Sequence, residues 1–180
     1  VTGVTTGVVS NTPISDVLSN TSSSTAVVSY EITPIGPGPT LCNGPEINYI
    51  VTIDPLPDAD ATPVDICSGS STNIILSNPN GVAGTNYSWT IGSVSGSVSG
   101  QTSGSGTVIS QVLTSTNGGS VEYLITPTAN GCPGATISRV INVAPLPVGD
   151  AVPVGTYEVC SGEALNIVPT LSIGTVGQFL

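Results

Sequence analysis

Apolar and polar residues alternate in short runs along this chain, and no window places apolar residues at helical spacing. In residues 121–127, for example, Val121, Tyr123 and Ile125 fall on one face of a pleated strand, whereas Glu122 falls on the other. This period of two residues is typical of a strand with one buried face. The pattern therefore predicts an all-β fold.

Several such runs follow one another in the middle of the chain. The predicted strands are 73–76, 87–90, 108–113, 121–127 and 135–143. Asn-Gly dipeptides beginning at Asn80, Asn117 and Asn130 supply turns between them. This number of short strands within about ninety residues is typical of an immunoglobulin-like β-sandwich.

The chain repeats itself with a period of about ninety residues. Pro-Leu-Pro followed by Cys-Ser-Gly occurs within residues 55–69 and again within residues 145–162. The matching segments predict three parts, namely the C-terminal part of one repeat (1–57), a complete repeat (58–147) and the N-terminal part of the next (148–180). In this alignment Val1 resumes the pattern at about Ile91.

Four aromatic residues are predicted to belong to the cores of these repeats. Trp89 is expected to fill the centre of the complete sandwich, and Phe179 occupies the same place in the next repeat. Tyr30 and Tyr123 open equivalent strands, where such sandwiches often carry a tyrosine bonded to a neighbouring loop. A plain half-buried tyrosine fits the sequence equally well.

The composition argues against several classes of function. The chain has 180 residues and no His, its single basic residue is Arg139, and its formal net charge is −10. This charge offers no basic surface to nucleic acids, and an anionic membrane repels it. Because His and Lys are absent, the usual general bases and amine nucleophiles are missing. We therefore expect no catalytic residue, no enzyme activity, no cofactor, no nucleic-acid partner and no membrane insertion.

The segments "CSGSSTNIILSN", "YSWTIG" and "VEYLITPTANGCPGATISRVINVAPLP" suggest a family. Together they resemble the PKD-like and Ig-like tandem repeats of very large Bacteroidota surface proteins, which include gliding-motility and other adhesins exported by type IX secretion. The resemblance covers nearly the whole chain. It implies an extracellular, cell-surface array that acts as a stalk or filament and has no catalysis of its own.

Four cysteines in a chain without Lys predict disulfides and an oxidising compartment. The resemblance implies that the two cysteines of one repeat pair with each other. This scheme joins Cys67 to Cys132 and leaves Cys42 and Cys160 to partners beyond the chain ends. The alternative joins Cys42 to Cys67 and Cys132 to Cys160, across adjacent repeats.

Asp58 and Asp60 form an Asp-x-Asp motif at the junction between two repeats. Clustered carboxylates at such a junction can bind Ca²⁺ and stiffen it. However, only Asp60 has a counterpart, Asp150, in the following repeat. Solvated linker charge is the plainer interpretation, and a calcium site is the alternative.

Three functions remain compatible with these patterns. The first is a structural stalk or filament segment of an adhesin, whose partners are neighbouring repeats of the same chain. The second is a module whose loops bind a glycan or a host protein. The third is a filament subunit whose two partial repeats are completed head to tail by identical subunits, as donated strands complete pilins.

Overall fold

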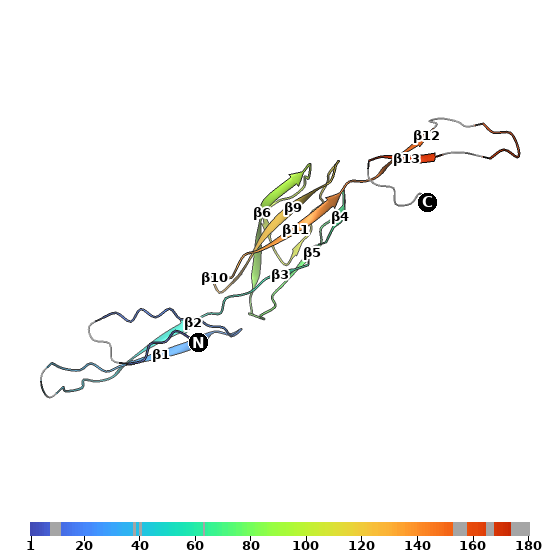
Figure 1. The fold of residues 1–180 in the computed structure, drawn as a ribbon. Helices are drawn as coiled ribbons and strands as arrows, with labels where there is room; N and C mark the ends of the chain where they lie inside the picture. Colours follow the sequence, from blue (N-terminus) through green and yellow to red (C-terminus); the bar gives the residue numbers. More distant parts are fainter. Residues whose placement is uncertain are drawn as a thin grey trace. The chain divides into compact units, whose positions relative to one another are not determined.

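The computed structural model describes residues 1–7, 12–37, 39, 41–62, 64–152, 158–164 and 168–173. Every regular element in these residues is a β-strand (Figure 1), so the all-β prediction is confirmed. A search of the same residues finds no helix with the length and apolar character of a membrane span.

The strands of the described residues form four sheets. Hairpin strands β1 (Ala26–Ile32) and β2 (Ile47–Ile53) form one, and β12 (Val148–Val152) and β13 (Val168–Ile173) form another. The remaining strands are β3 (Asp60–Ala61), β4 (Ile66–Cys67), β5 (Ile74–Ser77), β6 (Asn86–Gly96), β7 (Gly104–Ser105), β8 (Val108–Ile109), β9 (Gly119–Ala129), β10 (Cys132–Pro133) and β11 (Ile137–Ala144). They make a six-stranded sheet in the order β4-β11-β9-β6-β7, with β10 beside β9, and a three-stranded sheet in the order β3-β5-β8.

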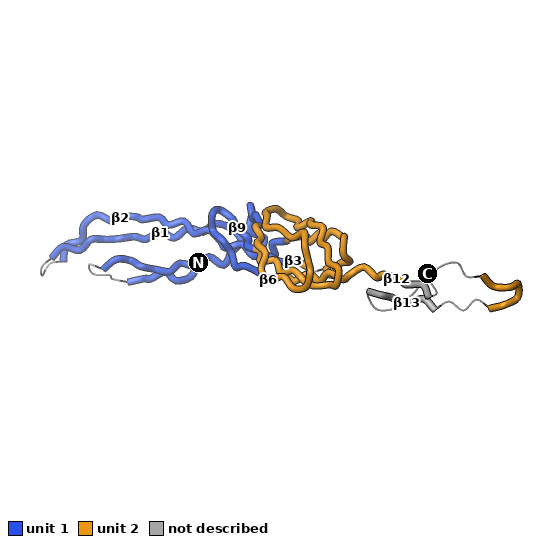
Figure 2. The backbone as a smooth tube through the Cα atoms, turned by 90° about the horizontal axis from the view of Figure 1, so that it is seen from above, with its two compact units in different colours: residues 1–60, 77–87, 126–137 blue, residues 61–76, 88–125, 138–180 orange. Residues whose placement is uncertain are grey.

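Contacts within the backbone divide the chain into two compact units (Figure 2). The first unit comprises residues 1–60, 77–87 and 126–137, and it contains the β1–β2 hairpin, the first Pro-Leu-Pro segment and β10. The second unit comprises residues 61–76, 88–125 and 138–180, and it contains β4, β7, β8, β12 and β13.

The alternation of side chains decides which residues of the complete repeat are buried. On β9, Val121, Tyr123 and Ile125 are each 0% exposed, whereas their neighbours along the strand are half-buried. The smaller sheet contributes Ile74 of β5 and Ile109 of β8, which are also buried. Two sheets whose apolar faces are buried in this way form a β-sandwich of the immunoglobulin-like kind, as the sequence predicts.

The predicted strands are present, but one of them ends early. Residues 108–113 were expected to form a strand, yet β8 covers only two of them. The side chain of Thr72 explains the difference, because its hydroxyl donates to the carbonyl of Ile109 (2.6 Å) and accepts from the amide of Gln111 (3.1 Å). A side chain that takes over backbone hydrogen bonds in this way interrupts regular strand pairing.

Residues 1–57 reproduce local contacts of the complete repeat and correct the alignment between them. In each segment an isolated bridge adjoins a glycine of positive φ; the matching sets are Thr2–Ser19 with Gly3 (φ 90°) and Ser99–Thr114 with Gly100 (φ 97°). A Cβ at either glycine would collide with a backbone carbonyl, so both positions require glycine. Val1 therefore corresponds to Val98, and not to Ile91 as the sequence alignment indicates.

Trp89 lies in β6 among the buried residues of the sandwich. Its side chain is 7% exposed, and Nε1 donates a hydrogen bond to the carbonyl of Thr102 (3.1 Å). Gly104 of β7 leaves room for the indole, because a Cβ there would lie 2.7 Å from Cζ2 of Trp89. Phe179, the expected equivalent in the next repeat, lies outside the described residues.

We predict that Trp89→Ala lowers the free energy of unfolding by about 3–5 kcal/mol, because it leaves a cavity in the core. Trp89→Phe should lose less, since phenylalanine fills part of the same volume. Urea unfolding followed by circular dichroism measures both losses. Ser88→Ala, at an exposed position of the same strand, is the control; a loss in Trp89→Ala no larger than in this control would contradict the prediction.

Candidate functional site

A tyrosine hydroxyl ties the core of the complete repeat to the loop before β9. Tyr123 donates to Oε1 of Gln111 at 2.9 Å. The same amide group accepts from the backbone NH of Thr102 (3.0 Å) and donates to its carbonyl (2.7 Å). Burial raises the pKa of Tyr123 to about 12, so the phenol remains a donor throughout the physiological range.

The first segment contains the same arrangement with a carboxylate in place of the amide. Tyr30 donates to Oδ2 of Asp16 at 2.7 Å, and the backbone NH of Thr5 donates to the same oxygen at 2.9 Å. Hydrogen bonds from Thr5, and then from Tyr30, lower the pKa of Asp16, whereas the bond to Asp16 raises the pKa of Tyr30. Tyr30 is half-buried.

These contacts support the loop-bonded interpretation of both tyrosines over the plain half-buried one. The partners, Gln111 and Asp16, were not singled out by sequence reasoning. The sequence signal that could have identified them is a shared seven-residue segment, "TPISDVL" at residues 12–18 and "TVISQVL" at residues 107–113. Its fifth residue accepts the hydrogen bond from the tyrosine in both places.

Side chains of the complete repeat hold the first Pro-Leu-Pro segment. Asn80 donates to the carbonyl of Leu56 (2.9 Å) and accepts from the backbone NH of Asp58 (3.2 Å). Pro57 is fully buried, and Gly134 lies so close to its carbonyl that a Cβ would collide with it. The Asn-Gly turn at Asn80, predicted from the sequence only as a turn, therefore also clips the linker.

Asp58 and Asp60, the predicted calcium candidates, are both exposed. Within the described residues, no group of three or more His, Cys, Asp or Glu side chains could hold a metal ion. Calcium normally takes six to eight oxygen ligands, which two carboxylates cannot supply alone. The geometry of this pair lends the calcium hypothesis no support, and metal binding itself stays an untested expectation.

Cys67 and Cys132, the predicted disulfide pair, are not brought together. Cys67 is paired in register with Ala144, the last residue of β11, whereas Cys132 is paired with Ala129, the last residue of β9. Because β9 and β11 are neighbours in one sheet and β10 follows β9 directly, most of the length of β9 separates the two cysteines. A disulfide needs Cα atoms within about 7 Å, and the register pairs the two cysteines with residues of different strands.

No disulfide joins Cys67 to Cys132 in the described residues, where both thiols are free, as is that of Cys160. Strand register sets the positions of the two cysteines, and their spacing along the sequence does not reveal them. Partners of Cys42 and Cys160 outside the chain stay a prediction.

The Cys-Ser-Gly motif forms the same turn at both of its occurrences. The fourth residue of each turn donates to the carbonyl of the first; the pairs are Ser70–Cys67 at 3.0 Å and Glu163–Cys160 at 3.1 Å. The third residue has a φ of 87° in one turn and 98° in the other. A type II turn requires positive φ at this position, which explains the repeated glycine.

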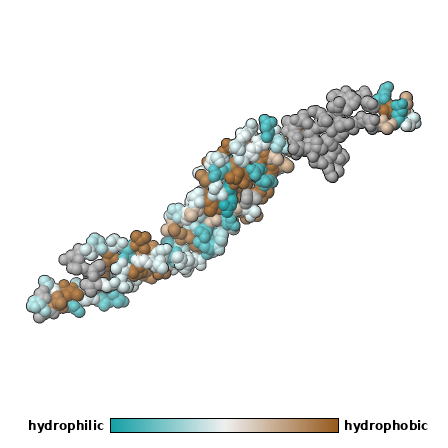
Figure 3. Space-filling model, in the orientation of Figure 1, coloured by the Kyte–Doolittle hydropathy of each residue, from teal (hydrophilic) through white to brown (hydrophobic). Residues whose placement is uncertain are grey.

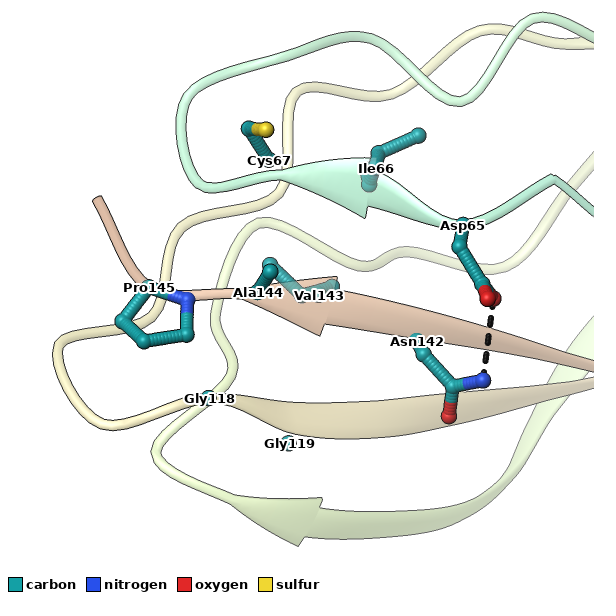
Figure 4. A pocket seen from close by; sticks show the side chains of 9 residues that line it. All are labelled: Asp65, Ile66, Cys67, Gly118, Gly119, Asn142, Val143, Ala144 and Pro145. Atoms are coloured by element: carbon teal, nitrogen blue, oxygen red, sulfur yellow. Dashed lines mark hydrogen bonds between the residues drawn. The ribbon is translucent and has the colours of Figure 1, made fainter. Parts of the chain in front are cut away.

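A shallow hollow of about 470 Å³ lies beside the first of these turns (Figure 4). Asp65 and Asn142 point toward each other across it, and the amide of Asn142 donates to Asp65 at 2.9 Å. The other lining residues, including Gly118 and Pro145, are apolar apart from the Cys67 thiol. One carboxylate already bonded to an amide and one thiol do not form an acid–base pair on a substrate.

Glu122 of β9 is the single carboxylate in the strands of the larger sheet. It accepts from the hydroxyl of Ser138 on β11 (2.6 Å) and from the backbone NH and hydroxyl of Ser93 on β6 (3.0 and 2.9 Å). These bonds, the one from Ser138 first, lower the pKa of Glu122. The side chain therefore ties three adjacent strands together and is poorly suited to act as a general base.

Arg139, the single basic residue, is used in the same structural way. Its Nε donates to the carbonyl of Ala61 on β3 at 2.6 Å, and Nη1 donates to the carbonyl of Ser138 at 2.8 Å. The half-buried Arg139 thus links a strand of the larger sheet to a strand of the smaller one through the hydrogen bonds of its guanidinium.

Comparison with known families gives one result. The model of the PKD-like domain matches residues 1–57 and 64–147, which is most of the chain. No curated protein and no solved structure is significantly similar to the chain.

We predict that acid loosens the Asp16 contacts and leaves those of Gln111 intact. The pKa of Asp16 is lowered in the folded chain, so its hydrogen bonds stabilise above the unfolded pKa of about 3.9 and are lost as pH falls through the folded pKa. The protection factor of the Thr5 amide, which is its slowing relative to the intrinsic exchange rate at each pH, should therefore fall at low pH, whereas that of Thr102 should not. Asp16→Asn should make the protection factor of Thr5 independent of pH; a variant in which it still falls would contradict this assignment.

Proposed function

Because this chain belongs to the PKD-like domain family, we propose that it is a structural spacer in an extracellular repeat array, forming part of the stalk or filament of a cell-surface adhesin. The family membership supports an extracellular Ig-like module. The observation that supports the spacer role is the restraint on the Pro-Leu-Pro segment (55–57), which ends residues 1–57 and leads into the complete repeat.

A spacer has to keep consecutive repeats extended, and this linker has few ways to bend. Proline fixes φ near −65° at both ends of the segment, and Asn80 bonds the backbone on either side of Pro57. Asp54, just before the segment, accepts from Thr25, the residue before β1 (2.6 Å), and from Asn130 (3.4 Å). Side chains that precede the linker in the sequence (Thr25) and that follow it (Asn80 and Asn130) therefore both restrain it.

The distribution of aromatic residues favours a spacer over a ligand-binding module. Recognition of glycans by stacking needs several exposed aromatic rings, and in the described residues Trp89, Tyr87 and Tyr123 are buried. Tyr49 is the described aromatic residue with a largely exposed side chain, at 64%. A single exposed ring is a poor platform for such a ligand.

The finer assignment depends on the sequence resemblance. The resemblance supports the proposal that the array belongs to the large adhesins of Bacteroidota, of the gliding-motility type, exported through type IX secretion. Neighbouring repeats of the same chain are then its structural partners, and its role is to set the distance between the cell and a binding region elsewhere.

We predict that cells displaying a protein without residues 58–147 retain adhesion, but that this shortened protein extends a shorter distance from the cell surface. This deletion joins Pro57 to Val148 and so reproduces the native Pro147–Val148 junction. Adhesion of the source cells and the height of the surface layer in electron micrographs measure the two effects. Antibody labelling of unpermeabilised cells is the control that the shortened protein is displayed; loss of adhesion by displayed protein would favour the binding-module alternative.

We also predict that Asn80→Ala loosens the linker without unfolding the repeat. Losing the hydrogen bond to Asn80 should raise amide exchange at Asp58 by about fivefold or more, since one hydrogen bond contributes about 1 kcal/mol. Exchange at Tyr123 should stay unchanged. Asn86→Ala, which removes only a local bond to Gly84 (3.0 Å), is the matched control, and equal exchange at Asp58 in both variants would contradict the clip.

A further inference from the structure

Asparagine is followed by glycine at four places in this chain, namely Asn43, Asn80, Asn117 and Asn130, and all four asparagine side chains are exposed. Hydrophilic residues are spread over the visible surface of the described residues (Figure 3). Asparagine is one of the thermally labile residues of proteins, and a following glycine favours its reaction because no side chain hinders the approach of the next backbone nitrogen. Since exposure is the same at the four sites, their hydrogen bonds decide which of them reacts.

The reaction needs no reagent other than water. The backbone nitrogen of the glycine attacks Cγ of the asparagine. An N–Cγ bond forms, the Cγ–Nδ2 bond breaks, and Nδ2 leaves as ammonia with the proton of the glycine NH. One water molecule then opens the resulting succinimide ring. Opening at Cγ gives aspartate, whereas opening at the main-chain carbonyl gives isoaspartate, whose main chain runs through Cβ and is one atom longer. Hydrogen bonds that hold either reacting group away from this geometry slow the reaction.

Two of the four sites are held by such hydrogen bonds. The NH of Gly44 donates to the carbonyl of Pro34 at 2.8 Å. The NH of Gly81 donates to the carbonyl of Asn78 at 3.2 Å. The side chain of Asn80 is in addition bonded at both ends to the linker backbone (2.9 and 3.2 Å). The nucleophile is therefore occupied at both sites, and at the second the side chain is also fixed.

The site at Asn130 is restrained by the hairpin between β9 and β10. Cys132 pairs with Ala129, so the turn between these strands has two residues. Asn130 and Gly131 have φ values of 50° and 80°, as a type I′ turn requires. Nδ2 of Asn130 also donates to Asp54 (3.4 Å). Ring closure needs rotation about the backbone of Asn130, which the paired strands on both sides oppose.

The site at Asn117 has none of these restraints. Asn117 lies in a bend before β9, outside any strand, and Gly118 has a φ of 80°. In the part of the chain that the structure describes, neither the side chain of Asn117 nor the NH of Gly118 makes a hydrogen bond. Gly118 also lines the open hollow beside the Cys67 turn (Figure 4), where water reaches this part of the backbone.

We propose that Asn117 is a site of spontaneous covalent modification, at which the chain loses ammonia and acquires isoaspartate or aspartate. Asn43, Asn80 and Asn130 react much more slowly in the folded chain. Each event adds one negative charge to a chain whose net charge is −10. The modified fraction therefore records how long a folded copy has been in water. This inference does not depend on the spacer role.

The isoaspartate form alters the start of β9, because its extra main-chain atom directly precedes two closely packed glycines. A Cβ at Gly118 would lie 3.2 Å from Cδ of Pro145, and a Cβ at Gly119 would collide with the carbonyl of Ser95. The next NH, that of Ser120, donates to Oγ of Ser95 at 3.1 Å. A longer main chain cannot keep all these positions, so the hydrogen bond of Ser120 is weakened.

Peptide mass spectrometry of the folded 180-residue chain, incubated at mildly alkaline pH, tests the ranking of the sites. Each event raises a peptide's mass by the difference between a hydroxyl and an amino group. Modification at Asn117 should exceed that at Asn80 by about tenfold or more, because the side chain of Asn80 must first break two hydrogen bonds. In guanidinium chloride the two sites should agree within about threefold, since unfolding removes the protection.

Two variants separate the sites without relying on the peptide map. Asn117→Gln should remove most of the ammonia released by the folded chain, because a glutamine would have to close a larger ring. Asn130→Gln is the matched control and should leave the release nearly unchanged. Circular dichroism checks that both variants stay folded. Equal modification of the four sites in the folded chain, or equal loss of ammonia release in the two variants, overturns the proposal.

Hydrogen exchange tests the effect on β9. The isoaspartate form, separated by anion exchange and identified by enzymatic methylation of its carboxylate, should show amide exchange at Ser120 raised by about fivefold or more. Asn117→Asp is the matched control, since it carries the same charge without the extra main-chain atom, and its exchange at Ser120 should equal that of the unmodified chain. Equal exchange in the isoaspartate form and in Asn117→Asp overturns this effect.

Discussion

A β-sheet whose one face is apolar is stable in water only when a second layer covers that face, and most features of this chain follow from that requirement. In residues 58–147 the larger sheet meets the smaller one, and Val121, Tyr123 and Ile125 are removed from solvent. The β1–β2 hairpin has the same alternation but keeps Ile32 and Ile47 exposed. The two segments therefore share the strand pattern and differ in how far the apolar face is buried.

Hydrogen bonds from neutral side chains fix the loops of this chain, where many other proteins use ion pairs. With one basic residue in the chain, loops are tied down by amides and hydroxyls. Gln111 connects Tyr123 to the loop at Thr102, and Asn80 connects the linker to a turn. Such bonds are insensitive to salt and, where no carboxylate takes part, to pH. The carboxylate at position 16 is the exception within this repeated scheme.

The sequence was sufficient to predict the features that depend on local spacing. Alternation located β9 and β11, and the glycine of Cys-Ser-Gly marked a turn that needs positive φ. The sequence was insufficient for features that depend on which strands pair with each other. Strand register places Cys67 and Cys132 beside the ends of different strands, for example, and their spacing along the sequence does not reveal this. The sequence likewise did not predict the hydrogen-bond acceptors of Tyr30 and Tyr123, because they lie in loops whose positions depend on the fold.

The use of Arg139 has a further consequence for survival outside a cell. Proteases of the trypsin type cut after Lys or Arg, and in these 180 residues Arg139 is the one possible target. It lies inside β11, which neighbours β9 in the larger sheet, and its guanidinium is bonded to two backbone carbonyls. A protease has to bind an extended, unpaired segment, so cleavage here requires the sheet to open first. The scarcity of basic residues thus leaves the folded repeat almost without a digestible bond for this class of enzyme.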